Sequence, residues 1–253
     1  MRWQKGIGAI CLILAWSSFG HIARADDQPA RGRLSGIAPQ FIGQSCIATV
    51  VMEINKEDWQ RKIKMQFWAL GGTKFLIRIL EPQEDAGTAI LKVDNTTWYY
   101  LPKAKRTVEM LPSMMLSSWM GSHFTLSDLV SESTLTDDYA TATSFEGDRN
   151  GVAVSEYTLT PKSDAAVVWG KIILEIRQAD QMPVWQRFYD EDGKLVRELS
   201  FSDYKTVSGK LIPTHLVMKP LDQAPEQTSI TFENIVFDSP IAEDIFALKN
   251  LKQ

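Results

Sequence analysis

The sequence predicts a mainly β protein (α+β class) in which one large antiparallel sheet is interrupted by a few short helices. Apolar and polar residues alternate with period two through most of residues 45–237, and clusters of turn-forming residues separate consecutive runs. Helical signals are confined to short stretches. Because short turns join antiparallel neighbours, the pattern favours a meander-like sheet. No linker, internal repeat or low-complexity tract divides the chain, and we expect a single domain over residues 26–253.

The first residues have the pattern of a secretory signal peptide. Residues 1–5 form a short start with two basic residues, and residues 6–19 form an uncharged, mostly apolar run. Residues 23–25 read Ala-Arg-Ala, a small-x-small cleavage site. The apolar run is too short for a spanning helix. We therefore expect residues 1–25 to be removed by cleavage near Ala25 and the mature protein to work outside the cytoplasm.

The predicted strands differ in how clearly they alternate. In the second of them, Ile63, Met65 and Phe67 share one face, opposite Lys62 and Lys64. Glycine and aspartate clusters mark turns between neighbouring runs. The predicted strands cover residues 47–56, 60–70, 73–81, 88–93, 97–101, 152–159, 167–176, 184–189, 194–204, 211–219 and 229–237.

Four short helices are expected. Residues 37–43 form the first, and residues 112–120 form the second, which opens with Pro-Ser and is followed by Gly121. Thr125 begins a third helix, since Thr-x-x-Asp has the character of a capping box. Residues 241–248 form the last, after a Ser-Pro pair and with two acids in its first turn.

Composition narrows the possible functions. Three of the 27 basic residues lie in the first twenty-five, so the mature chain has 24 basic against 31 acidic residues, a net charge of −7. That balance favours an aqueous compartment and argues against a nucleic-acid surface. Only Cys46 survives cleavage, which excludes an intrachain disulfide, and we expect it to be a buried apolar residue at a strand start.

Several strands are apolar on both faces, although a sheet over one core needs only one apolar face. Trp68, Trp98, Tyr100, Trp185 and Tyr189 all lie opposite other large apolar residues of their strands. Two interpretations stay open at this point. The second face packs against a helix, or it lines a cavity for a long apolar ligand, and both bury the same residues.

The most specific pattern lies in residues 84–130. It contains Trp-Tyr-Tyr-Leu-Pro at 98–102, Lys-Arg at 105–106, Ser-Trp-Met-Gly-Ser at 118–122 and Asp-Leu at 128–129. This segment resembles the periplasmic family of outer-membrane lipoprotein-sorting proteins, within the LolA/LolB-like superfamily. The order of strands and the secreted start agree with that family over the rest of the mature chain, with weaker motifs.

The resemblance implies a sheet curled into an incomplete barrel, with short helices as a lid over an apolar cavity. It also implies a periplasmic protein that binds a lipid or lipoprotein acyl chain, with a resistance-nodulation-division-type exporter as a membrane partner. The chain departs from the family at His123, where an acidic residue is usual. The strand arginine with which LolA holds its lid closed has no assignable position in the sequence.

Ten residues are candidates for ligand or partner contact. Those expected at the cavity or lid are Trp68, Trp98, Tyr100, Met114, Met115, Trp119 and Phe124, for which ordinary packing is the alternative. Methionine suits surfaces that accept varied partners. Lys103, Lys105 and Arg106 form a basic turn that contacts anionic headgroups or an acidic partner, or is simply a solvated hairpin tip.

An enzyme is not expected. His123 and His215 are far apart in the mature chain, and it contains no His-x-x-x-His, Cys-x-x-Cys, Gly-x-Ser-x-Gly or glycine-rich phosphate loop. We expect no metal and no cofactor. The sequence thus predicts a monomeric, non-enzymatic periplasmic carrier of a lipid or lipoprotein acyl chain. Two alternatives remain: a regulatory sensor that binds lipid or protein, and a structural subunit of a transporter complex.

Overall fold

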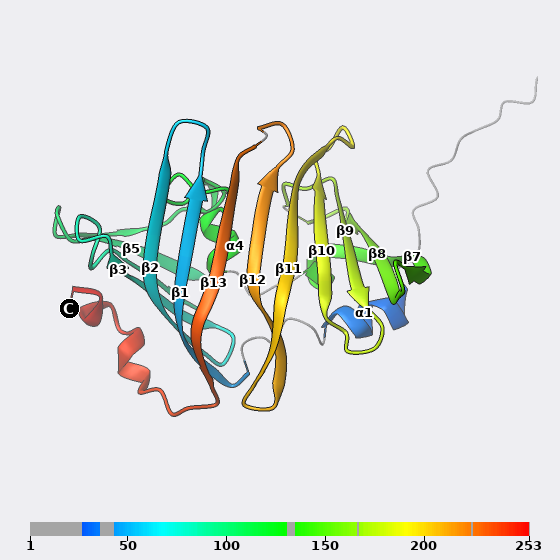
Figure 1. Ribbon diagram of the computed structural model, residues 1–253. Helices are drawn as coiled ribbons and strands as arrows, with labels where there is room; N and C mark the ends of the chain where they lie inside the picture. The colour runs from blue at the N-terminus through cyan, green and yellow to red at the C-terminus, as the bar shows by residue number, and fades with distance from the viewer. Residues whose placement is uncertain (1–26, 36–42, 131–134, 166, 224, 253) are drawn as a thin grey trace, which may run out of the picture.

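The computed structural model describes residues 27–35, 43–130, 135–165, 167–223 and 225–252. Thirteen strands form one antiparallel sheet (Figure 1). The strands are β1 (Ser45–Asn55), β2 (Gln60–Leu70), β3 (Lys74–Glu81), β4 (Ala89–Val93), β5 (Thr96–Leu101), β6 (Arg106–Glu109), β7 (Tyr139–Arg149), β8 (Val152–Pro161), β9 (Lys171–Arg177), β10 (Pro183–Tyr189), β11 (Leu195–Val207), β12 (Lys210–Pro220) and β13 (Gln227–Phe237). The expected signal peptide and nearly all of the expected helix at 37–43 lie outside the described residues.

The strand order determines where the helices must go. The order is β6-β5-β4-β3-β2-β1-β13-β12-β11-β10-β9-β8-β7, so the chain builds one half outward from β1 and the other half inward from β7. The segment between β6 and β7 therefore joins the two outer edges and has to cross one face. It contains α3 (Pro112–Met115), α4 (Leu126–Val130) and α5 (Leu135–Asp138). Figure 1 shows α4 behind β1 and β13, on that crossed face.

The crossed face holds the larger hydrophobic core. We call the segment between β6 and β7 the lid. Alternate residues of both halves, such as Met65, Ile77, Leu174 and Met218, point to this side and pack with lid residues including Phe124. The opposite face holds a smaller cluster, in which Leu76, Leu91 and Tyr100 pack against Phe246 and Leu251. The last two belong to the 3-10 turns η1 (Glu243–Phe246) and η2 (Leu248–Lys252). We call the crossed side the concave face and the opposite side the convex face.

The predicted fold class is confirmed: the protein is mainly β, with one antiparallel sheet that does not close into a barrel and a few short helices. The outer edge at β7 is accompanied by α1 (Gln28–Ser35), and the backbone N–H of Asp27 donates to the carbonyl of Thr141 at 2.8 Å. Among the described residues, no helix is long and apolar enough to cross a bilayer.

Some elements differ from the sequence prediction. The sequence pattern did not predict β6 and β7, because β6 has only four residues and β7 is rich in Ala, Thr, Ser and Gly, which alternate weakly. The strand predicted at 167–176 begins only at Lys171. The helix predicted at 112–120 ends at Met115. Met120 and Gly121 take positive φ angles, so the chain turns there before α4.

Candidate functional site

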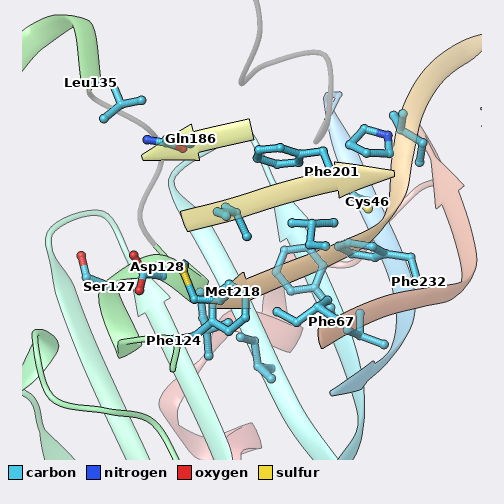
Figure 2. Close-up of a pocket in the computed structure, with 18 of the residues that line it drawn as sticks. Cys46, Phe67, Phe124, Ser127, Asp128, Leu135, Gln186, Phe201, Met218 and Phe232 are labelled. Atoms are coloured by element: carbon cyan, nitrogen blue, oxygen red, sulfur yellow. The ribbon is translucent and has the colours of Figure 1, made fainter. Parts of the chain in front are cut away.

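A cavity of about 440 Å³ lies between the concave face and the lid segment (Figure 2). Its volume falls in the range of about 300–1,000 Å³ that is usual for small-molecule sites. Most of its lining is apolar and comes from both halves of the sheet and from the lid. These side chains are Cys46, Val50, Met65, Phe67, Ile77, Phe124, Leu129, Leu135, Tyr139, Trp169, Ile172, Phe188, Leu199, Phe201, Ile212, Pro213, Leu216, Met218, Ile230, Phe232, Ile235 and Phe237.

Polar lining groups gather at one side of the cavity. Ser127, Asp128 and Gln186 are the polar side chains that line it, and Figure 2 shows all three on the left of the view, with Cys46 and Phe232 on the right. Gln186 lies on β10 directly between leucines of β9 and β11 in the strand register. The amide of Gln186 is therefore a polar group between leucines. Together with Ser127 and Asp128 it gives a mostly apolar cavity a few polar groups.

Cys46 belongs to the apolar wall. It lies on β1, its side chain is buried, and burial raises the pKa of the thiol to about 12. A thiol that stays protonated is a small apolar side chain and a weak nucleophile. This agrees with the sequence interpretation of Cys46 as a buried strand residue.

A buried ion pair fastens the lid to the sheet. Arg197 on β11 donates from its two terminal nitrogens to the two carboxylate oxygens of Asp128 on α4, both at 2.8 Å. The guanidinium carbon lies 4.7 Å from the ring centre of Trp169 and 4.3 Å from that of Phe188. The Arg197 side chain is only 8% exposed and that of Asp128 is 21% exposed. We call this pair the latch, since it spans the junction between lid and sheet.

The local sequence of α4 prepares Asp128 for this role. The Thr125 hydroxyl accepts from the backbone N–H of Asp128 at 3.1 Å, and Asp128 Oδ2 accepts from the backbone N–H of Thr125 at 2.7 Å. These reciprocal bonds are the capping box predicted from the sequence. They hold the carboxylate at the start of α4, where the helix dipole favours a negative charge.

A second tie holds the segment just before α4. The His123 ring places Nε2 at 2.7 Å from Lys56 Nζ and 3.0 Å from Glu226 Oε2, and Nδ1 at 2.8 Å from Thr228 Oγ1. Burial, followed by the nearby Lys56 charge, lowers the pKa of His123, although the bond to Glu226 opposes this shift. Bonds from Lys56 and His123 lower the pKa of Glu226 to about 2. The tautomer decides whether Nε2 accepts from Lys56 or donates to Glu226.

The predicted lid residues are placed differently from one another. Phe124 lines the cavity. Met115 packs against the concave core, while Met114 is exposed. Trp119 is 4% exposed and lies with Met114 and Tyr99 around a smaller hollow between the lid and β5–β6. Ligand contact by these residues stays a prediction.

The placement of three other predicted residues is corrected by the structure. Trp68, Trp98 and Tyr100 lie in the cluster on the convex face, outside the cavity lining. Each is one residue away from a concave-facing neighbour, such as Phe67 beside Trp68, and side chains alternate along a strand. The sequence indicated two apolar faces, and the cavity is on the other one.

Of the residues that line the cavity, the sequence predicted only Phe124. Gln186 and Arg197 are two polar residues of the site that it did not predict. Arg197, Leu199 and Phe201 occupy the same face of β11, so a charge on an otherwise apolar stripe was the available signal. Gln186 interrupts the stripe of β10 in the same way. No group of three His, Cys, Asp or Glu side chains in the described part of the chain is placed to hold a metal ion.

A family model described as that of an uncharacterized protein matches residues 71–253, more than half of the chain. The chain belongs to this family. No functionally curated protein matches the sequence.

Solved structures confirm the resemblance to the LolA/LolB-like superfamily at the level of the fold. A domain from Vibrio parahaemolyticus that is named for outer membrane lipoprotein sorting is similar, with a TM-score of 0.77, 23% identity and coverage of 88% of this chain and 97% of that one. A DUF1329 family protein from Desulfovibrio piger has a TM-score of 0.80 and 19% identity, with coverage of 90% of this chain and 99% of that one. A LolA superfamily protein from Nitrosomonas europaea has a TM-score of 0.73 and 19% identity, with coverage of 87% of this chain and 98% of that one.

Proposed function

We propose that this protein is a periplasmic, non-catalytic carrier that binds an acyl chain of a lipid or lipoprotein in the cavity and releases it at a membrane. The observation that supports this most directly is the apolar cavity of about 440 Å³ between the concave face and the lid. Each methylene removed from water contributes about 0.8 kcal/mol, so such a cavity holds a long chain without specific chemistry.

The polar side of the cavity suits the headgroup end of the ligand. Gln186 offers an amide donor and acceptor at this side of the cavity. The Asp128 carboxylate is already engaged by Arg197 and Thr125, so it contributes little free charge. We therefore propose that the acyl chain lies against the aromatic interior with its polar end near α4.

Loading and release need the lid to move. In this proposal the latch separates, α4 swings away from β11 and the cavity opens beside it. Arg197 stays between Trp169 and Phe188, where ring contacts hold the guanidinium in place. Removing a charged hydrogen-bond partner from a largely buried group is costly, and so a closed lid is favoured until a ligand or membrane partner offsets that cost.

The remaining parts of the proposal concern place and partners. The signal-like residues 1–25 support export to the periplasm with cleavage near Ala25. A resistance-nodulation-division-type exporter is the proposed membrane partner, and the monomer is the proposed working state. The intact mass of the protein recovered from periplasm shows whether the chain is cleaved near Ala25. Its mass under native conditions shows whether it is a monomer.

The decisive experiment is native mass spectrometry of protein purified from periplasm without detergent, followed by titration with a fluorescent fatty acid. Bound lipid, or saturable uptake of the probe, is expected. Leu199→Trp fills the cavity and should abolish uptake, while Leu221→Trp, at an exposed site, should not. A clean apo mass with no uptake would refute the carrier. Net transfer of lipid between vesicles separates a carrier from a sensor, which needs no turnover.

A further inference from the structure

An exposed apolar surface lies beside the lid. Eleven large apolar side chains are exposed in the described part of the chain, and four of them fall within residues 101–116: Leu101, Leu111, Met114 and Leu116. Leu111 is the most exposed of the eleven, at 61%. Leu101 and Met114 line the same hollow of about 290 Å³, so β5 and α3 contribute to one continuous surface. Soluble proteins seldom leave such a patch without a use.

Three cations border this apolar surface. Lys103, Lys105 and Arg106 are exposed at the β5–β6 turn, and Arg106 lies directly opposite Leu101 in the strand register. None of the three has a carboxylate at ion-pair distance among the described residues, whereas cations such as Lys56, Lys62 and Lys74 do. Their charges are therefore available to an outside partner.

Strand alternation places the acid nearest in sequence to this surface on the other face of the sheet. Glu109 is the one acid between residues 101 and 119. It pairs with Trp98, whose side chain belongs to the convex cluster, so Glu109 lies on the opposite face of β6 from Arg106 and Val108. Within residues 101–119, the side that carries Leu101 and Met114 thus bears only positive charge, in a chain whose net charge is −4. Asp85, which acts electrostatically on Tyr99 at the same hollow, is already paired with Arg61.

We infer that these residues, Leu101, Lys103, Lys105, Arg106, Leu111, Met114 and Leu116, form a docking patch for the surface of an anionic membrane. Apolar side chains with adjacent lysine and arginine favour the boundary between headgroups and acyl chains. An anionic surface repels the acidic remainder of the protein and attracts this patch, and so docking is oriented. An apolar-faced protein partner would not require three unpaired cations.

The docking patch is one helix away from the cavity. Leu126 on α4 lines the hollow of the patch, and the next two residues, Ser127 and Asp128, line the cavity. Insertion of Leu111 or Met114 into a membrane therefore acts on α4 and on the latch. Docking would bring the opening of the cavity to the lipid surface, where an acyl chain can pass without crossing water.

The experiment is co-sedimentation of the periplasmic protein with vesicles of phosphatidylcholine alone and with one-third phosphatidylglycerol. We expect binding to the anionic vesicles only, weakened as salt rises from 50 to 500 mM, since surface charges are screened over about 10 Å at 0.1 M. Lys103→Glu with Lys105→Glu and Arg106→Glu should weaken binding at least about tenfold. Leu111→Asp should weaken it at high salt as well, because it removes the apolar contact.

Matched controls use the other half of the molecule. Lys194→Glu with Lys205→Glu and Lys219→Glu changes the net charge equally at exposed cations, and Leu221→Asp places the same acid at another exposed leucine. Both controls should bind like the wild type. Equal loss in controls and patch variants, or no binding of the wild type to anionic vesicles, would overturn the docking patch and leave a protein partner as the occupant. Uptake of a fluorescent fatty acid in solution tests the carrier proposal separately.

Discussion

The two halves of the sheet shield the large apolar side chains of their convex faces from water in different ways. In the half formed by β1–β6, the large convex side chains are covered by the C-terminal 3-10 turns, whose Phe246 and Leu251 are buried against β3–β5. Arg78 of β3 also donates to the backbone carbonyl of Asn250 at 2.9 Å. In Figure 1 this C-terminal segment lies beside β2 and leaves β7–β11 uncovered.

In the half formed by β7–β13, arginines take the place of a covering segment. The Arg187 guanidinium lies 4.1 Å from the ring centre of Trp185, and Arg177 lies 3.8 Å from that of Tyr204. Carboxylates hold both arginines: Glu198 on the neighbouring β11 accepts from Arg187 at 2.7 Å, and Asp180 in the turn after β9 accepts from Arg177 at 2.7 Å. Each guanidinium shields one ring face and keeps its own charge in water.

This difference shows that an apolar residue on the outer face of a strand does not by itself predict a cavity or a cover. Trp98 and Trp185 look alike in the sequence, since each sits opposite apolar neighbours in a short strand. One becomes part of a second core and the other part of a charged surface. The C-terminal cover and the arginine contacts should contribute differently to the free energy of unfolding.

Loss of the C-terminal cover should have the largest effect. Phe246→Ala removes a ring that is only 5% exposed, and we expect a loss of about 3–4 kcal/mol in the free energy of unfolding. The midpoint of urea denaturation measures it. Leu248→Ala, at an exposed position of the same segment, should change stability by less than about 0.5 kcal/mol. Similar small losses for both variants would show that the cover contributes little.

The latch of the β7–β13 half should come next. Asp128→Ala leaves the Arg197 guanidinium largely buried without its carboxylate, and should cost about 2–3 kcal/mol. Hydrogen exchange should rise in α4 before it rises in the sheet. Arg197→Met should cost less, because the remaining carboxylate of Asp128 can reach water. If Arg197→Met proves the more damaging, the ring contacts of the arginine matter more than the ion pair.

The arginine–aromatic stacks should contribute less than the cover. A double-mutant cycle of Arg187→Ala and Trp185→Ala should give a coupling energy of about 0.5–1 kcal/mol, the range of exposed cation–π pairs. Trp98→Ala on the covered half should cost about 2 kcal/mol, because Trp98 is partly buried against the convex cluster. Comparable losses for Trp98→Ala and Trp185→Ala would remove the distinction between the two convex faces.

Acid should loosen the tie between the lid and both halves of the sheet. The pKa of His123 is lowered by folding, so the unfolded chain takes up that proton first, and stability falls as the pH drops below about 6.5. Glu226 adds a second fall between pH 4.5 and about 2. Urea midpoints measured from pH 8 to 3 should show both slopes. His123→Gln should remove the upper slope alone, and an unchanged upper slope would assign it elsewhere.

Much of the fold follows from local pattern. The period-two runs located most strands and their antiparallel order, and the Thr125–Asp128 capping box was found where the sequence placed it. Both features depend on residues close in the chain. The strands β6 and β7 escaped prediction because their pairing partners supply what their own composition lacks.

The site required contacts between distant segments. Arg197 and Asp128 are 69 residues apart, and His123 meets Glu226 across 103 residues. No local pattern relates such residues, because their proximity comes from the crossing of the lid segment between the two sheet edges. Contacts between distant segments also explain the expected cavity residues Trp68, Trp98 and Tyr100, because the C-terminal turns cover them on the convex face.

The sequence by itself determined which side chains share a face of each strand, how consecutive strands pair, and that the chain is acidic with a secretory-type start. Only the tertiary structure decided which of the two apolar faces encloses the cavity, and which is covered by the C-terminus or shielded by arginines. The physical reason is that alternation along a strand is set by backbone geometry, whereas burial of a face depends on the segment that packs against it. That segment can come from anywhere in the chain.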